Sequence, residues 1–168
     1  MLGKYENFPL SIHFFEKFSS TVNIKQLQQK LVQTLRELNS KTCYFEEISI
    51  PTILNSEIIF EFGIAEEESF NFLDEQEISR VPSILGRSSL DFFCVIRYYK
   101  YHGEKKSALK FDYYIFRTNF AVRELEFQVF HKQGPRYITP EELVAMIIDK
   151  INKTTSKSKK ILHETTDF

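Results

Sequence analysis

Two of the four histidines are the side chains best suited to acid-base chemistry. His13 and His131 both fall in segments that we expect to form strands, and each has charged residues nearby. If the fold brought one of them against Glu16 or Asp112, the pair could move a proton, because histidine titrates near neutral pH. A histidine in such a segment more often lies at the surface or makes a structural hydrogen bond. We therefore predict no catalytic residue.

The motifs of the common catalytic and cofactor-binding classes are absent from the sequence. It contains no glycine-rich phosphate loop, dinucleotide fingerprint, HExxH, CxxC or GxSxG. Cys94 lies between Phe93 and Val95, where burial should raise the pKa of its thiol and keep it protonated. Cys43 is distant from it in the sequence. We expect two reduced thiols, no cofactor and no metal, which together favour a non-enzymatic function.

Charge is unevenly divided along the chain, although the formal net charge is only -1. Residues 46–80 contain ten acidic residues and one basic residue, a balance of -9. Within this region, Phe70, Phe72 and Leu73 are embedded among acids, which favours docking onto a protein partner. The acids of residues 66–77 could also bind a divalent cation through oxygen ligands. They lack the alternation and central glycine of an EF-hand loop, so a solvated acidic segment is the simpler interpretation.

The following region is basic and aromatic. Residues 97–136 contain nine basic and four acidic residues, a balance of +5. The cations and rings that could neutralise phosphates and stack bases on an open sheet are Arg97, Tyr99, Tyr101, Lys110 and Arg117. The glycines of the RRM signature are absent, and a pI of about 6.4 is low for a protein that mainly holds a polyanion. Nucleic-acid binding is therefore an alternative to protein binding.

Two helices are predicted from their start signals and apolar spacing. Thr139 and Glu142 have the types and spacing of a capping box, and the helical apolar period that follows predicts a helix over residues 139–151. Asn23 is a suitable N-cap for a second helix over residues 23–38. Both helices carry one broad apolar stripe, which the fold must bury.

The remaining segments predict strands. The 17 Phe and 8 Tyr, with no Trp, favour a sheet-rich fold, because rings at alternating positions suit a half-buried pleated surface. The apolar period predicts strands over residues 8–18, 42–50, 57–65, 90–101, 109–118 and 122–131. Residues 92–96 are apolar on both faces, which is typical of a central strand covered from both sides. Residues 122–131 alternate, as in a strand with one wet face.

The order strand, helix, five strands, helix predicts a single α+β domain. In it a mainly antiparallel sheet of five to six strands carries both helices on one face. At the level of element order this is similar to half of a TATA-box-binding-protein-like saddle and to a helix-grip domain. We expect the domain to occupy residues 1–152, followed by a polar, lysine-rich tail over residues 153–168. Ile161 and Leu162 are apolar exceptions in this tail and are candidates for contact with a partner.

These features favour a non-enzymatic interaction domain, a subunit or adaptor of a larger intracellular complex. Its candidate protein-binding residues are Phe70, Phe72, Leu73, Ile161 and Leu162. Two alternatives stay open: a nucleic-acid-binding sheet surface, and a pocket for an apolar ligand between the final helix and the sheet. The N-terminus has no apolar run, and no stretch is long enough to span a bilayer, so we expect a cytoplasmic or nuclear protein that does not bind membranes.

Overall fold

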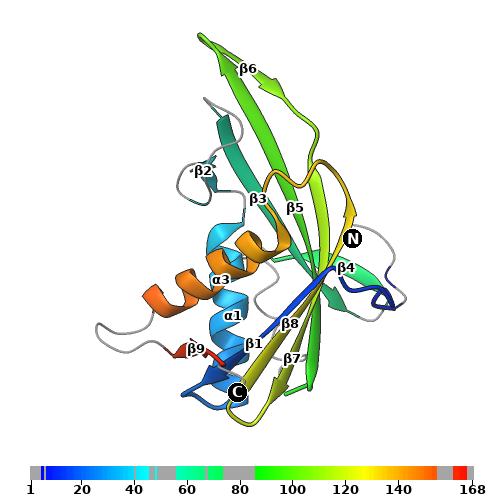
Figure 1. Cartoon of the computed structure of the whole chain (residues 1–168), viewed down its shortest axis with the longest axis vertical. Coiled ribbons are helices and arrows are strands. Elements are labelled where there is room, and N and C mark those ends of the chain that lie inside the picture. The colour runs from blue at the N-terminus through cyan, green and yellow to red at the C-terminus, as the bar shows by residue number, and fades with distance from the viewer. Residues whose placement is uncertain are drawn as a thin grey trace.

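The computed structural model describes residue 5 and residues 7–39, 41–45, 48, 56–66, 68–73, 86–154 and 161–165. Figure 1 shows a long, twisted sheet with the helices packed beside it. In chain order the described elements are β1 (Phe14–Ser20), α1 (Ile24–Leu38), β2 (Thr42–Tyr44), β3 (Ser56–Glu66), β4 (Ser69–Phe72), β5 (Ser89–His102), β6 (Lys105–Ala108), β7 (Asp112–Ala121), β8 (Glu124–Gln133), α3 (Pro140–Thr154) and β9 (Leu162–Glu164).

The described strands form one antiparallel sheet in the order β2-β3-β5-β7-β8-β1-β9, with β4 paired to β3 and β6 paired to β5. The α+β class and the antiparallel sheet are confirmed. The prediction of five to six strands is wrong, because the described sheet has nine, and the predicted element order differs accordingly. The strands that were missed are β4, β6 and β9, which have four, four and three residues. Runs so short hold too few alternations for a period to be recognised.

Both helices begin at the N-cap residues that the sequence predicts. The backbone N–H of Gln26 donates to Oδ1 of Asn23 at 2.8 Å. At α3, the N–H of Glu142 donates to Oγ1 of Thr139 at 3.2 Å, and the N–H of Thr139 donates back to Oε1 of Glu142 at 2.9 Å. These bonds satisfy N–H groups that a helix start leaves without partners. Neither helix is long and apolar enough to cross a membrane, among the described residues.

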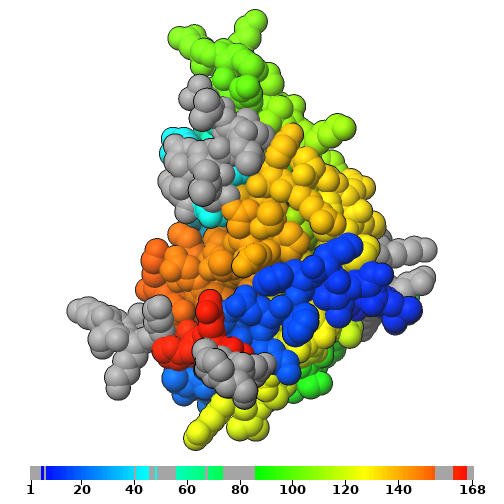
Figure 2. Space-filling view, in the orientation of Figure 1, coloured from blue at the N-terminus to red at the C-terminus, as the bar shows by residue number. Residues whose placement is uncertain are grey.

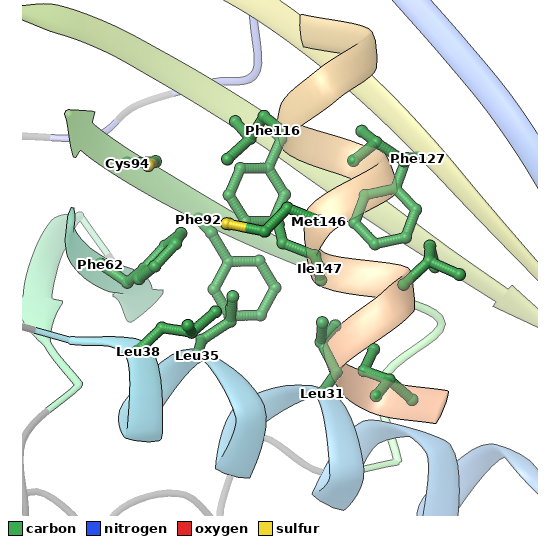
Figure 3. Close-up of a cluster of buried hydrophobic side chains, with 14 of the residues drawn as sticks. Leu31, Leu35, Leu38, Phe62, Phe92, Cys94, Phe116, Phe127, Met146 and Ile147 are labelled. Atoms are coloured by element: carbon green, nitrogen blue, oxygen red, sulfur yellow. The ribbon is translucent and has the colours of Figure 1, made fainter. Parts of the chain in front are cut away.

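The main core lies between the helices and the sheet face that they cover, here called the inner face. Figure 3 shows side chains from α1, α3 and the central strands meeting there. The labelled residues are Leu31, Leu35, Leu38, Phe62, Phe92, Cys94, Phe116, Phe127, Met146 and Ile147. A smaller cluster on the opposite, outer face contains Tyr5, Phe70, Phe93 and Val95. Strand β5 is therefore covered on both sides, as its apolar run predicts.

The described residues before β1, residue 5 and residues 7–13, do not form a strand. β1 begins at Phe14, and the N-terminal strap, defined as residues 5 and 7–13, crosses the outer face of the sheet. The backbone N–H of Tyr5 donates to the carbonyl of Glu68 at 2.7 Å, and the N–H of His13 donates to the carbonyl of Val129 at 2.8 Å. These contacts tie the strap to the turn between β3 and β4 at one end and to β8 at the other. Proline inside residues 8–18 explains why the predicted strand is shorter.

Several predicted features fall partly outside the described residues. The strand predicted at residues 42–50 is described as a strand only at Thr42–Tyr44. Residues 74–85, which include several of the acids offered as cation ligands, lie outside the described part of the chain. The predicted polar tail contributes to the sheet where it is described, because β9 pairs with β1.

Candidate functional site

Two arginines on the outer face are each held by an acidic side chain of a neighbouring strand. Nε of Arg97 on β5 lies 2.7 Å from Oε1 of Glu61 on β3. Arg117 on β7 donates to both carboxylate oxygens of Asp91 on β5, from Nε at 2.7 Å and from Nη2 at 2.9 Å. Such two-point pairs fix geometry as well as charge. The positive charge of both arginines is therefore balanced within the chain.

The N-terminal strap covers the Asp91–Arg117 pair. The ring of Phe8 lies 4.9 Å from the guanidinium carbon of Arg117, and the hydroxyl of Tyr5 donates to Asp91. Burial, reinforced by the bond to Asp91, raises the pKa of Tyr5 far above its ordinary value. The strap therefore covers part of the sheet surface that we predicted could bind nucleic acid.

The other nucleic-acid candidates lie toward the β5–β6 hairpin, which projects beyond the body of the protein in Figure 1. Nζ of Lys106 lies 4.4 Å above the ring of Tyr99 and 3.0 Å from Glu57, which also accepts the hydroxyl of Tyr101. Lys110 is exposed and forms no ion pair with any residue that the structure describes. Arg97, Tyr99 and Tyr101 share the outer face of β5.

Arg117 lies far from this hairpin. In the pairing of β7 with β5, Arg117 lies opposite Asp91, whereas Tyr101 lies ten positions further along β5. At about 3.3 Å per residue this separates the two by roughly 33 Å along the strand. The five candidates therefore do not form one compact site.

The acidic-segment candidates are packed inside the molecule. Phe70 is buried against Tyr5 and Phe93, with ring centroids 4.7 and 5.2 Å away. Phe72 is half-buried on the same outer-face cluster. Leu73 belongs instead to the main core. These side chains hold β4 against the sheet.

The tail candidates are buried as well. Ile161 and Leu162 both join the main core. Oδ1 of Asn152 on α3 accepts the backbone N–H groups of Ile161 at 3.1 Å and Leu162 at 3.0 Å. The side chain of Asn152 also donates to the carbonyl of Leu162 at 3.1 Å. This amide fastens β9 to the end of α3, so the two tail residues anchor the chain to its own core.

One of the predicted histidine–carboxylate pairs does form. The fully buried Asp112 on β7 has Oδ1 2.9 Å from Nε2 of His131 on β8. The same carboxylate accepts the backbone N–H of Arg136 at 2.7 Å, that of Tyr137 at 3.1 Å, and the hydroxyl of Tyr98. Burial and this bond raise the pKa of Tyr98 far above its ordinary value. Asp112 therefore joins β5, β7 and β8 to the loop that leads into α3.

Both ring nitrogens of His131 are engaged. Because an ionised carboxylate only accepts, Nε2 of His131 donates to Asp112. Nε of Arg136 donates to Nδ1 of His131 at 3.1 Å. His13 lies beside it, with Nδ1 accepting the backbone N–H of His131 at 2.9 Å. Burial, Arg136 and His131 lower the pKa of His13. The arrangement holds the strands in place and leaves His131 no free nitrogen for a substrate.

An exposed apolar patch, defined as Leu10, Ile12 and Phe15, lies on the strap and the start of β1. Leu10 is fully exposed, and Ile12 and Phe15 expose 43% and 62% of their surface. A regular strand over residues 8–18 would place Leu10 and Ile12 on one face and Phe15 on the other, so the sequence did not predict this patch. A proline at the second position of that run was the available indication against a regular strand.

A groove runs between α3 and the edge formed by β1 and β9, with a volume of about 580 Å³. Glu16 and Phe18 line it from β1, and Ala145, Ile148, Asp149 and Asn152 line it from α3. β9 closes one end with Leu162, His163 and Glu164. Three distant segments build this groove, so no local sequence pattern could have indicated it.

The surface features described above are an exposed apolar patch and a groove. No group of three or more His, Cys, Asp or Glu side chains within the described ranges could hold a metal ion. No protein-family model, curated protein or solved structure significantly matches the chain. The exposed apolar patch and the groove beside it are the features whose chemistry bears on function.

Proposed function

We propose that this chain is a non-enzymatic interaction domain, a subunit or adaptor of a larger complex, that docks a protein partner on the apolar patch. The observation that carries this proposal is the exposure of Leu10, Ile12 and Phe15 within six positions of one another. Single exposed apolar residues are ordinary, whereas a local group of large ones is typical of an interaction site.

The exposed apolar side chains favour a protein partner over a polyanion. Burying one large apolar side chain contributes roughly 1.5–3 kcal/mol, so three together offset a substantial part of the cost of association. A polyanion would gain little from these side chains. Arg97 and Arg117, which could have attracted one, are already paired with Glu61 and Asp91.

The test is affinity purification of the tagged chain from its native source, followed by quantitative mass spectrometry. The variant Leu10→Asp/Ile12→Asp/Phe15→Asp should lose the partners that co-purify in constant ratio with the unmodified chain. Val122→Asp is the matched control, because Val122 is 82% exposed on the turn between β7 and β8. It should keep every partner.

Two results would count against the proposal. One is a native chain that elutes alone at about 20 kDa, which is its monomer mass. The other is a set of partners that survives the triple substitution. Circular dichroism of each variant checks that the fold is retained, as expected for substitutions at exposed positions.

A further inference from the structure

The groove beside β1 combines an apolar floor with acidic walls. Phe18, Ile148 and Leu162 are buried beneath it, while Glu16 and Glu164 rise from β1 and β9. Figure 2 shows β1 in blue, α3 in orange and β9 in red meeting on one face of the protein. A long side chain with an apolar stem and a charged end could lie along such a floor and reach the carboxylates.

Part of the β1 edge that borders the groove has backbone groups directed away from β8. Ser20 donates its N–H to Arg123 on the β8 side at 2.9 Å, and Lys17 accepts the N–H of Thr165 on the opposite side at 3.4 Å. These directions alternate along an antiparallel strand, so the N–H and C=O of Phe15 also point away from β8. Among the described residues, β9 pairs with β1 only at Phe18–Ser20.

The charges at the groove are incompletely balanced. Asp149 is paired with Lys153 at 2.9 Å. Glu16 and Glu164 form no ion pair with any residue in the described part of the chain. Burial, followed by the charges of Glu164 and Glu141, raises the pKa of Glu16. A cation entering the groove would relieve this repulsion.

We propose that the groove receives an extended, basic segment of a partner protein, which adds as a strand to the β1 edge at Phe15. Because side chains alternate across a strand, a Lys or Arg of that segment lies in the groove against Glu16 and Glu164, and the adjacent apolar residues lie beside Phe15. This inference rests on the proposed function, since Phe15 belongs to the docking patch. It adds the class of partner: a segment in which basic and apolar residues alternate.

The first experiment measures binding of a short, end-capped peptide that alternates valine and arginine. A peptide alternating valine and glutamate is the control. The valine–arginine peptide should bind the full chain, and a variant ending at Thr165, which keeps β9, is measured beside it. The proposal is supported if the peptide binds to either form and slows hydrogen exchange at the backbone N–H of Phe15. Binding to neither overturns it.

Amide hydrogen exchange distinguishes strand addition from loose attraction of a cation. With peptide at saturation, the N–H of Phe15 should exchange at least about tenfold more slowly, because it gains a partner. The N–H of Glu16 should not change, since Glu16 pairs with Phe127 on β8. Equal protection of both amides, or of neither, would overturn the proposal.

Substitution tests the charge. Glu16→Gln should weaken peptide binding by about tenfold, whereas Glu104→Gln in the exposed β5–β6 turn should leave it within about twofold. Equal effects would show binding to acidic surface in general and would overturn the proposal. If the peptide fails to bind while the triple patch variant still loses its partners, this inference fails and the proposed function stands. If the peptide binds and the partners survive the triple substitution, the proposed function fails instead.

Discussion

Oδ1 of Asp112 lies 2.9 Å from Nε2 of His131, at the place where β7 and β8 run side by side. Asp112 is completely buried, and its carboxylate also accepts two backbone N–H groups from the loop before α3. A buried charge is tolerated when hydrogen bonds surround it. This pair is therefore a structural connection between the sheet and the last helix.

Removing the carboxylate should strongly destabilise the fold. In Asp112→Ala, the donors from His131, Tyr98 and the loop lose their acceptor inside the protein. We expect the free energy of unfolding to fall by about 3–5 kcal/mol. Urea denaturation followed by circular dichroism measures it. The control Asp149→Ala, whose side chain is 58% exposed, should change stability by no more than about 0.5 kcal/mol. A loss below about 1 kcal/mol for Asp112→Ala would contradict this account.

A methyl group at Gly134 should be poorly tolerated. Gly134 has a φ of +117°, and a Cβ there would overlap the carbonyl of Phe111 and the side chain of Asp112. Backbone strain and overlap together should cost Gly134→Ala about 3 kcal/mol. Gly103 has a φ of +64° with open space around it, so Gly103→Ala should cost only about 1 kcal/mol. Comparing the two melting curves separates overlap from strain, and equal losses would show that overlap is unimportant.

Gly63 leaves room for the ring of Phe93 on the outer face. A Cβ at Gly63 would overlap this ring, so Gly63→Ala should destabilise the protein by about 1–3 kcal/mol. In a Phe93→Ala background the same substitution should cost much less, because the obstacle is gone. A double-mutant cycle measures the difference as a coupling energy. A coupling energy near zero would mean that the ring of Phe93 moves aside without lowering the free energy of unfolding.

Glu16 should make stability depend on pH. Burial, Glu164 and Glu141 raise its pKa above the ordinary value of 4.5 in the folded protein. The folded state therefore binds the proton more tightly than the unfolded state does. The resulting stabilisation is complete below pH 4.5 and is lost as the pH rises through the folded pKa. Glu16→Gln should thus be slightly more stable than the unmodified protein at pH 7, by no more than about 0.5 kcal/mol.

Denaturation curves at pH 7 and at pH 3 provide the measurement, with Glu104→Gln as the exposed control. The gain from Glu16→Gln should be present at pH 7 and absent at pH 3, since the native carboxyl is protonated there. A variant less stable than the unmodified protein at pH 7 would indicate that Glu16 is favourably paired.

The contacts of the candidate residues were only partly predictable from the sequence. His131 with Asp112 was one of the possible histidine–carboxylate pairs, since both histidines lie on predicted strands beside charged residues, and the structure contains that pair. Nothing in the sequence indicated that Arg97 and Arg117 would be paired with Glu61 and Asp91. Strand pairing decides those contacts, and the register of two strands cannot be read from either strand alone.

Local sequence patterns were enough to predict the α+β class, the starts of α1 and α3, and the long strands β3, β5, β7 and β8. Capping and apolar periodicity depend on residues only a few positions apart, so local sequence is sufficient for them. Three features became visible only in the assembled fold: β1 lies between β8 and β9, Ile161 and Leu162 are buried, and a groove opens beside α3. Each of these depends on segments more than a hundred positions apart meeting in space, because burial and hydrogen bonding are properties of the assembled fold.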